Sequence, residues 1–355
     1  MRALVSVSDK TGVEALGRGL VELGAELYST GGTQRALEVA GVPVRAVSEL
    51  TGFPEILEGR VKTLHPAIHG GILARRDVAS DLAELDQHGL GPLDLVAVNL
   101  YPFEETVAQP GTRLDQALEQ IDIGGPALLR AAAKNYPAVL PVCDPADYAV
   151  VLEALRRPSG PDEAFRRRLA AKAFRHVAVY DALIAAYLGA DDIEWPDELP
   201  LGLRKVQELR YGENPQQRAA FYAIVQPQPE PSGMTGAPRP AAPGLVGAPR
   251  VGAGQLQGKP LSYNNILDAD AAWAVSSDFA PATVAIIKHT NPCGLARATD
   301  LLVAYEQALA GDPLAAFGGI VSLNVPVDGP LARRLVERFY EIVLAPAFSD
   351  EALAI

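Results

Sequence analysis

The chain opens with MRALVSVSDKTGVEALGRGLVELGAELYSTGGT, residues 1–33, in which short apolar runs alternate with a segment of helical spacing. Ala3–Ser6 and Glu26–Ser29 have the length and apolar character of buried strands. Between them, apolar residues recur at helical intervals, at Val13, Leu16, Leu20 and Leu23. Ser8 or Asp9 can cap this helix. The order strand, helix, strand is typical of a parallel sheet covered by helices.

The same alternation continues along the chain. Thr30-Gly31-Gly32-Thr33 leads into a short helix, and Leu93–Leu100 (LDLVAVNL) and Ala138–Cys143 are further runs of strand length. We therefore predict an α/β domain with a parallel sheet flanked by helices. Such sheets bind ligands at the carboxyl ends of their strands. Polar residues fall at three of these ends, at Ser8, at Thr30–Thr33 and at Asn99-Leu100-Tyr101.

A long helix and an acidic, proline-containing segment indicate a second domain. Arg166–Leu188 carries an apolar stripe at Leu169, Ala173, Val177, Tyr180, Ile184 and Leu188. Gly189–Pro200 has the composition of a linker, so we predict domains at 1–195 and 203–355. Val284–Lys288 and Ile320–Leu323 are expected strands of the second domain. The Pro/Gly-rich stretch Gln226–Gln257 predicts a flexible surface insertion within it.

Composition argues against several classes of protein. The 355 residues suffice for roughly two domains, and the net charge of −12 disfavours a nucleic-acid-binding face but permits small anionic substrates. Two cysteines, Cys143 and Cys293, are too few for a disulfide framework or a cysteine metal site. We expect no targeting peptide at the start, no membrane-spanning run and a cytoplasmic location.

Two strand ends have residues suited to phosphate. Ser8-Asp9-Lys10-Thr11 and Thr30-Gly31-Gly32-Thr33 offer hydroxyls, backbone N–H groups and the Lys10 charge at helix starts. Taken singly, each is better explained as an ordinary N-cap, because capping residues are common at helix starts. Neither contains the Gly-x-Gly-x-x-Gly or P-loop pattern, which disfavours a dinucleotide or nucleoside triphosphate.

The stretch QIDIGGPALLRAAAKN, residues 120–135, combines an acid, glycines and a lysine. Asp122 precedes the Gly124-Gly125-Pro126 turn, and the turn opens a helix that ends at Lys134. The free N–H groups of such a helix start favour an anion. A helix from Pro126 to Lys134 spans about 12 Å. Lys134 must therefore reach round with its long side chain, or a partner subunit must complete the site.

The loop Arg60-Val61-Lys62-Thr63-Leu64-His65-Pro66 brings two cations and a hydroxyl together. These cations can equally be solvated surface charges. His65 and His69 have the spacing of a helical metal pair, but Pro66 lies between them and no third ligand is evident. We expect no metal site.

Long motifs in both domains resemble one known family. SVSDKTG, STGGT, ELTGFPEILEGRVKTLHPAIHGGILAR, NLYPF and QIDIGGPALLRAAAKN resemble the inosine monophosphate (IMP) cyclohydrolase domain of bifunctional purine biosynthesis proteins. LRYGENPQQ, GKPLSYNNILDADAAW, IKHTNPCG and DPLAAFGGIVSLN resemble the first part of their second domain, AICAR transformylase, where AICAR is 5-aminoimidazole-4-carboxamide ribonucleotide. The resemblance implies a methylglyoxal-synthase-like (MGS-like) parallel α/β domain, then part of a cytidine-deaminase-like α/β domain.

The resemblance also implies two consecutive reactions. The second domain transfers a formyl group from 10-formyltetrahydrofolate, a folate cosubstrate, to AICAR. The first then closes formyl-AICAR by dehydration to IMP, and neither step needs a metal in this family. Family members are homodimers with transformylase sites at the interface.

Residue roles in the first domain follow from the resemblance. Lys62, Tyr101, Asp122 and Lys134 would be catalytic. Nucleotide-binding residues would be Ser8, Lys10, Thr11, Thr30, Gly32, Thr33, Arg60, Thr63, Asn99, Gly124 and Gly125.

In the second domain Lys288 and His289 would be catalytic, because a histidine suits proton removal from the attacking amine. Arg210, Tyr211 and Asn214 would contact AICAR, and Phe317, Gly318 and Gly319 would shape the base pocket. A lone Lys-His pair is otherwise an ordinary strand end in solvent. Cys293 is expected to be a small buried residue.

The final segment, Phe348–Ile355, resembles a mid-domain segment of the family. We therefore expect a complete cyclohydrolase half, an incomplete transformylase half with weak or no activity alone, and some uncovered apolar surface. Two other functions are open, a non-catalytic regulatory nucleotide-binding module of MGS-like fold and a phosphate-eliminating lyase. The absent dinucleotide motif disfavours an oxidoreductase.

Overall fold

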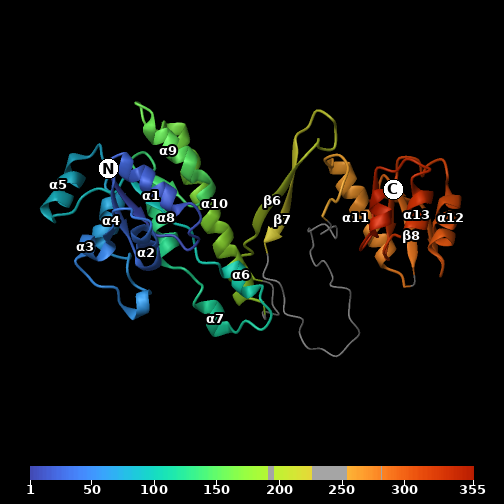
Figure 1. Cartoon of the computed structure of the whole chain (residues 1–355), viewed down its shortest axis with the longest axis horizontal. Coiled ribbons are helices and arrows are strands. Elements are labelled where there is room, and N and C mark those ends of the chain that lie inside the picture. Colours follow the sequence, from blue (N-terminus) through green and yellow to red (C-terminus); the bar gives the residue numbers. More distant parts are fainter. Residues whose placement is uncertain (191–195, 226–253, 281) are drawn as a thin grey trace. The chain divides into compact units, whose positions relative to one another are not determined.

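The computed structural model describes residues 1–190, 196–225, 254–280 and 282–355. Their contacts group them into two compact units, the first from Met1 to Gly202 and the second holding the described residues from Leu203 to Ile355. We call these unit 1 and unit 2 (Figure 1). Residues 191–195 of the predicted linker and 226–253 of the predicted insertion lie outside the described residues.

Unit 1 is built on a five-stranded parallel sheet of order β3-β2-β1-β4-β5. The strands are β1 (Arg2–Val5), β2 (Glu26–Ser29), β3 (Arg45–Ala46), β4 (Leu95–Ala97) and β5 (Leu140–Val142). The predicted parallel α/β class is confirmed. β4 is shorter than the predicted Leu93–Leu100 at both ends. At the first end, the Leu93 N–H bonds to the carbonyl of Gly71 instead of a neighbouring strand.

Helices cover both faces of this sheet. They are α1 (Val13–Glu22), α2 (Gly31–Val39), α3 (Val47–Thr51), α4 (Pro66–Leu73), α5 (Ala79–Gln87), α6 (Phe103–Val107), α7 (Leu114–Leu118), α8 (Gly124–Lys134), α9 (Tyr148–Arg156) and α10 (Glu163–Leu188), with 3-10 turns at Leu57–Gly59 and Pro145–Asp147. α1 and α9 share one core with alternate sheet residues, such as Ala3 and Val5. α8 contacts β4, β5 and α10.

The start of α1 differs from the prediction. Neither Ser8 nor Asp9 caps this helix, which begins after Gly12 in the left-handed conformation (φ 71°) and has no side-chain cap. Asp9 instead accepts the backbone N–H of Thr11 at 2.9 Å. The chain between β1 and α1 therefore forms a loop before the helix begins.

The long helix α10 begins before the predicted Arg166, because Asp162 caps it by accepting the N–H of Phe165 at 2.7 Å. Most of its predicted apolar stripe is buried, including Ala173 and Val177. Leu188 is 52% exposed, so the helix extends beyond the core at this end.

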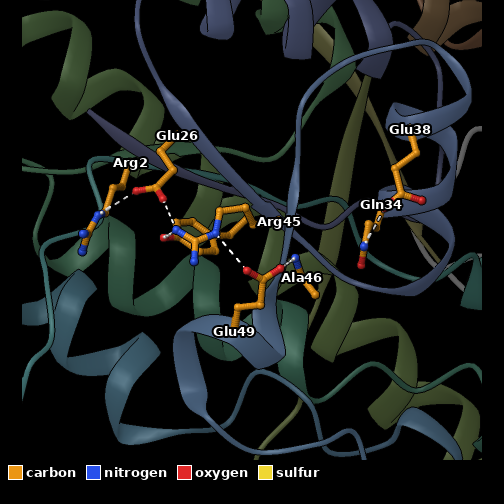
Figure 2. Close-up of polar contacts among 8 residues, drawn as sticks. Arg2, Glu26, Gln34, Glu38, Arg45, Ala46 and Glu49 are labelled. Carbon is orange, nitrogen blue, oxygen red and sulfur yellow. Dashed lines mark hydrogen bonds and ion pairs between the residues drawn. The ribbon is translucent and has the colours of Figure 1, made fainter.

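Ion pairs attach the edge of the sheet in unit 1. Arg45 of β3 pairs with Glu26 of β2 and donates to Glu49 of α3 at 3.0 Å (Figure 2). Glu26 also accepts from Arg2 of β1 at 3.2 Å. These contacts link the first residues of three neighbouring strands. They therefore lie at the opposite edge of the sheet from the carboxyl ends of the strands.

Unit 2 contains a four-stranded sheet of order β11-β10-β8-β9 and a separate pair of strands, β6 (Gly202–Leu209) and β7 (Ala219–Val225). The sheet strands are β8 (Thr283–Lys288), β9 (Asn291–Arg297), β10 (Ile320–Leu323) and β11 (Ile342–Leu344), and the helices are α11 (Tyr263–Ser277), α12 (Leu301–Gly311), α13 (Gly329–Leu335) and α14 (Asp350–Ala354). Ile286 packs with α12 and α13, whereas Ile287 packs with α11. The sheet thus lies between helical layers.

Within the part of the chain that the structure describes, no helix has both the length and the apolar character required to cross a membrane.

Candidate active site

The carboxyl ends of β1, β2 and β4 open into one cleft of about 730 Å³ in unit 1. Its walls include most of the predicted first-domain site, namely Ser8, Lys10, Thr30, Gly32, Thr33, Arg60, Lys62, Thr63, Asn99, Tyr101, Asp122, Gly124 and Gly125. Segments distant in sequence meet here because parallel strands place their carboxyl ends along the same edge. The cleft is therefore a consequence of the sheet topology.

Two side chains fix the loop that follows β1. Asn99 accepts the N–H groups of Ser8 and Asp9 and donates to the Asp9 carbonyl at 2.9 Å. Thr33 accepts the N–H of Val7 at 3.0 Å and donates to the carbonyl of the same residue at 2.9 Å. Both side chains are buried, so the loop that carries Lys10 is held against β4 and α2.

Two lysines give the cleft its positive charge. The Lys10 ammonium donates to the carbonyls of Val7 and Ser8, and a β-carbon on Gly32 at the start of α2 would lie 3.9 Å from its Cε. Burial, and then the nearby positive charge of Lys62, lower the pKa of Lys10. A bound anion would relieve this repulsion and would also meet the positive end of α2.

Asp122 lines the same cleft from the segment just before α8. Its Oδ1 accepts the N–H of Gly125 at 2.9 Å. Burial raises the pKa of Asp122, while the Gly125 hydrogen bond and the Lys62 charge act in the opposite direction. A β-carbon at Gly125 would lie 2.2 Å from Asp122 Oδ2, so any larger residue at this position would displace the carboxylate.

A tyrosine of α10 holds the segment that carries Asp122. Tyr180 accepts the backbone N–H of Asp122 and donates to the carbonyl of Gln120, both at 2.8 Å. Burial raises the pKa of Tyr180 to about 12, so its hydroxyl remains protonated near neutrality. From the sequence, Tyr180 is only part of the apolar stripe of its helix, because no local pattern indicates this long-range contact.

The outer wall of the cleft carries a further ion pair. Arg60 pairs with Glu119, and both side chains are more than half exposed. Glu119 also lines the cleft but was not among the predicted residues. Thr63 is buried, and its Oγ1 would lie 2.9 Å from a β-carbon at Gly124. Glycine at position 124 thus allows Thr63 to lie close to the start of α8.

Thr11 and Lys134 do not line this cleft. The Thr11 side chain is in the exposed loop before α1. Lys134 lies at the far end of α8, in a separate hollow of about 610 Å³ with Arg130, Arg167 and Phe174. The helical separation expected from the sequence is therefore present, and the Lys134 side chain does not reach round to Asp122.

His65 and His69, which have the spacing of a helical metal pair, lie at the start of α4 and within it. His65 caps α4, its Nδ1 accepting the N–H of Ala67 at 3.2 Å, and His69 follows within the same helix. In residues 1–190, 196–225, 254–280 and 282–355, the structure groups no three His, Cys, Asp or Glu side chains as a metal site.

In unit 2, the predicted catalytic pair lies beside the predicted base-pocket residues. Lys288, at the end of β8, donates to the carbonyl of Phe317 at 2.9 Å. Gly318 follows in the left-handed conformation (φ 69°), and a β-carbon at Gly319 would lie 2.8 Å from the Ile287 carbonyl. His289 is exposed in the turn after Lys288. Cys293 is only half-buried at the margin of the core that includes α12, so it is less enclosed than the buried residue expected from the sequence.

The predicted AICAR contacts form a different part of unit 2. Arg210 lies over the ring of Tyr211, 4.9 Å from its centroid. The Asn214 N–H donates to Gln217 Oε1 at 2.8 Å. This loop is tied to the start of α11, because Tyr263 donates its N–H to the Tyr211 carbonyl and Asn264 donates to the Glu213 carbonyl.

Family models match both parts of the chain. The model described as "AICARFT/IMPCHase bienzyme" matches residues 132–355, and that described as "MGS-like domain" matches residues 12–127. The chain therefore belongs to the AICARFT/IMPCHase bienzyme family, with an MGS-like domain in its N-terminal part. This confirms the family inferred from the motifs.

Curated relatives carry the name "Bifunctional purine biosynthesis protein PurH". Those from Chloroflexus aurantiacus, Desulfitobacterium hafniense and Lactiplantibacillus plantarum are 55%, 51% and 49% identical over 100% of this chain. The chain spans about two thirds of their length, 65%, 66% and 65% respectively. The crystal structure of ForH matches with a TM-score of 0.50 and 44% identity, over 54% of this chain and 98% of that one.

Proposed function

We propose that the cleft of unit 1 is an IMP cyclohydrolase site that closes the pyrimidine ring of formyl-AICAR. One observation carries this proposal: a single cleft combines the cations Lys10 and Lys62 with Asp122, whose pKa burial raises. The cations suit the 5′-phosphate and developing negative charge. A carboxylate with a raised pKa suits proton transfer near neutrality.

The reaction divides into two proton movements. The carboxamide nitrogen attacks the formyl carbon, a C–N bond forms, and one proton of that nitrogen moves to the former formyl oxygen. The hydroxyl then leaves as water with the proton of the formamido nitrogen, and the C=N bond forms. Asp122 accepts and returns the proton, Lys62 stabilises the oxyanion, and Tyr101 donates a hydrogen bond to the substrate.

Binding the nucleotide would position the two reacting groups. Ser8, Lys10, Thr30, Gly32 and Thr33 hold phosphate and ribose at the start of α2, with Thr11 steadying the loop through its backbone. Arg60, Thr63, Asn99, Gly124 and Gly125 surround the base. Asn99 already uses both ends of its amide on the Ser8–Asp9 loop, so it would contact the base through its remaining amide proton.

Lys134 enters this mechanism through a second copy of the chain. It faces the hollow formed by α8 and α10, outside the cleft that holds Asp122. We therefore place it, in a homodimer, at the cleft of the partner subunit, where a further cation would complete the oxyanion stabilisation.

Unit 2 is the proposed AICAR transformylase part, with 10-formyltetrahydrofolate as cosubstrate and no metal. The AICAR amine would attack the formyl carbon, His289 would take the amine proton, and Lys288 would stabilise the oxyanion. As this intermediate collapses, the bond between the formyl carbon and N10 of the cosubstrate would break, and N10 would leave with the proton from His289, which gives tetrahydrofolate. The contact of Lys288 with Phe317 supports this assignment, since it joins the catalytic pair to the Phe317-Gly318-Gly319 pocket. Arg210, Tyr211 and Asn214 would bind AICAR. The expected compartment is the cytoplasm.

The test combines turnover with binding. The purified chain is mixed with formyl-AICAR, and IMP formation is followed by absorbance, while calorimetry measures IMP binding. If the unsubstituted chain forms IMP, and Lys62→Met loses this activity but still binds IMP, the cyclohydrolase proposal is supported. Binding without any turnover by the unsubstituted chain would favour the regulatory module instead.

A further inference from the structure

The turn that carries His289 has an unusual backbone. His289 and Thr290 are consecutive non-glycine residues in the left-handed region, with φ of 53° and 61°. Side chains make this region unfavourable, so such residues persist only where surrounding contacts hold them. The turn joins β8 to β9 directly after Lys288. Its conformation decides where the His289 imidazole points.

One carboxylate holds both backbone N–H groups of this turn. Asp268 of α11 accepts from Thr290 at 2.7 Å through Oδ1 and from His289 at 3.3 Å through Oδ2. On the other side, the His289 carbonyl accepts from the Thr290 hydroxyl at 2.7 Å and from Asn291 Nδ2 at 2.8 Å. The two backbone N–H groups of the turn are thus held by a side chain of α11. The His289 carbonyl is held by the two residues that follow it.

The helix that carries Asp268 is itself fixed at its start. Ser262 and Asn265 form a reciprocal capping box there, and Asn264 donates to the Glu213 carbonyl at 3.2 Å. Asn264 and Asp268 are four residues apart, hence on the same helical face about 6 Å along the axis. α11 therefore connects the loop of Arg210 and Asn214 to the turn of His289.

We propose that Asp268 is a positioning residue that holds the His289–Thr290 turn in its left-handed conformation and so orients His289 toward AICAR. The AICAR part rests on the proposed transformylase function of unit 2. Both carboxylate oxygens are used, one for each N–H. Because the two N–H groups lie against different oxygens, an asparagine in the same orientation would place its NH₂ group against one of them and lose that contact.

The first measurement reads the turn without any substrate. The full chain is labelled with ¹⁵N-histidine and ¹⁵N-threonine, and amide hydrogen exchange of His289 and Thr290 is followed by NMR. We expect both amides to exchange about tenfold faster in Asp268→Ala, and only one of them in Asp268→Asn. Asp278→Asn, which removes a carboxylate at the end of the same helix, is the matched control and should leave both rates unchanged.

The second measurement connects the turn to AICAR. Calorimetry should give about tenfold weaker AICAR binding for Asp268→Ala than for Asp278→Asn, with equal melting temperatures. Adding Thr290→Gly should recover part of this loss, because glycine adopts the left-handed region without a carboxylate to hold it. A purely structural role of Asp268 predicts no such rescue.

The two proposals fail separately. Unchanged exchange of both amides in Asp268→Ala would overturn the positioning role, whatever the binding result. Faster exchange with unaltered AICAR binding would overturn the link to AICAR. An unsubstituted chain that binds no AICAR would refute the proposed function of unit 2, and the exchange rates would still decide what holds the turn.

Discussion

In the proposed mechanism, Asp122 would serve catalysis at the expense of stability. Its carboxylate accepts the N–H of Gly125, its backbone N–H donates to the Tyr180 hydroxyl, and burial raises the pKa of the carboxyl group. Ionising a buried carboxylate is unfavourable, so the folded state holds the proton more tightly than the unfolded chain. The same property makes it a better proton acceptor and donor near neutral pH.

We therefore expect Asp122→Asn to reduce cyclohydrolase kcat by about 10² or more without lowering the melting temperature at pH 7. Below the unfolded-state pKa of about 3.9, Asp122 is protonated in both states and the two proteins should melt alike. As the pH rises through the raised pKa of the folded state, the unsubstituted chain should lose stability relative to the variant. Scanning calorimetry from pH 4 to pH 7 measures this, and a variant that melts lower at pH 7 would contradict it.

Glu119 pairs with Arg60 in the cleft, so in the proposed function it would compete with the bound nucleotide for that guanidinium. The pair is exposed, so its own contribution to stability is small. We expect Glu119→Gln to leave the melting temperature unchanged and to lower KM for formyl-AICAR by a few-fold, since Arg60 becomes available to the nucleotide. Glu153→Gln, which breaks an exposed pair with Arg157 on α9, is the matched control. A raised KM would show that Glu119 itself binds the substrate.

At the scale of elements, α8 supplies both a helix start and a support for Asp122. Gly125→Ala places a β-carbon 2.2 Å from Asp122 Oδ2 and should lower kcat by about tenfold or more through displacement of the carboxylate. Gly70→Ala in α4 is the control, because its β-carbon would meet only Leu85 Cδ2 at 3.4 Å. It should be neutral or stabilising by up to about 1 kcal/mol. Equal kcat values for the two variants would contradict the proposal that the start of α8 positions the Asp122 carboxylate.

Tyr180 of α10 supports the segment that carries Asp122, and a substitution can test this support. Tyr180→Phe deletes a hydroxyl that contacts both Asp122 and Gln120, and it leaves a partly buried N–H unpaired. We expect a loss of about 1–3 kcal/mol in the free energy of unfolding, measured by denaturant titration. A fall in kcat without a matching rise in KM should accompany it. Tyr148→Phe in α9, also a buried tyrosine of unit 1, controls for general loss of a hydroxyl.

Local sequence patterns predicted the elements and the edge of the sheet that carries the cleft. Strand ends at Ser8, Thr30 and Asn99 could be aligned because parallel topology places them together. The patterns failed where contacts are long-range. Gly12, and no polar cap, precedes α1, and neither Tyr180 nor Glu119 has a local signal that indicates its role. The roles of individual site residues rest on the family resemblance.

For the whole molecule, the position of Lys134 makes a prediction about assembly. If a partner subunit supplies it, Asp122→Asn and Lys134→Ala should each be inactive alone. An equal mixture, allowed to exchange subunits, should recover about a quarter of the original activity, because half of the random dimers contain one intact site. Sedimentation confirms that the mixed species is a dimer. No recovery in exchanged dimers would place Lys134 outside the site or within its own subunit.

Ring closure at the unit 1 cleft can be followed directly. Formyl-AICAR is mixed with excess chain, and ¹H NMR follows the formyl proton as it becomes the purine C2 proton of IMP. We predict rapid conversion by the unsubstituted chain and by Lys205→Met, which removes an exposed lysine of unit 2. Lys62→Met should slow conversion by at least about 10². Conversion by Lys62→Met at the original rate would contradict the assignment of this cleft.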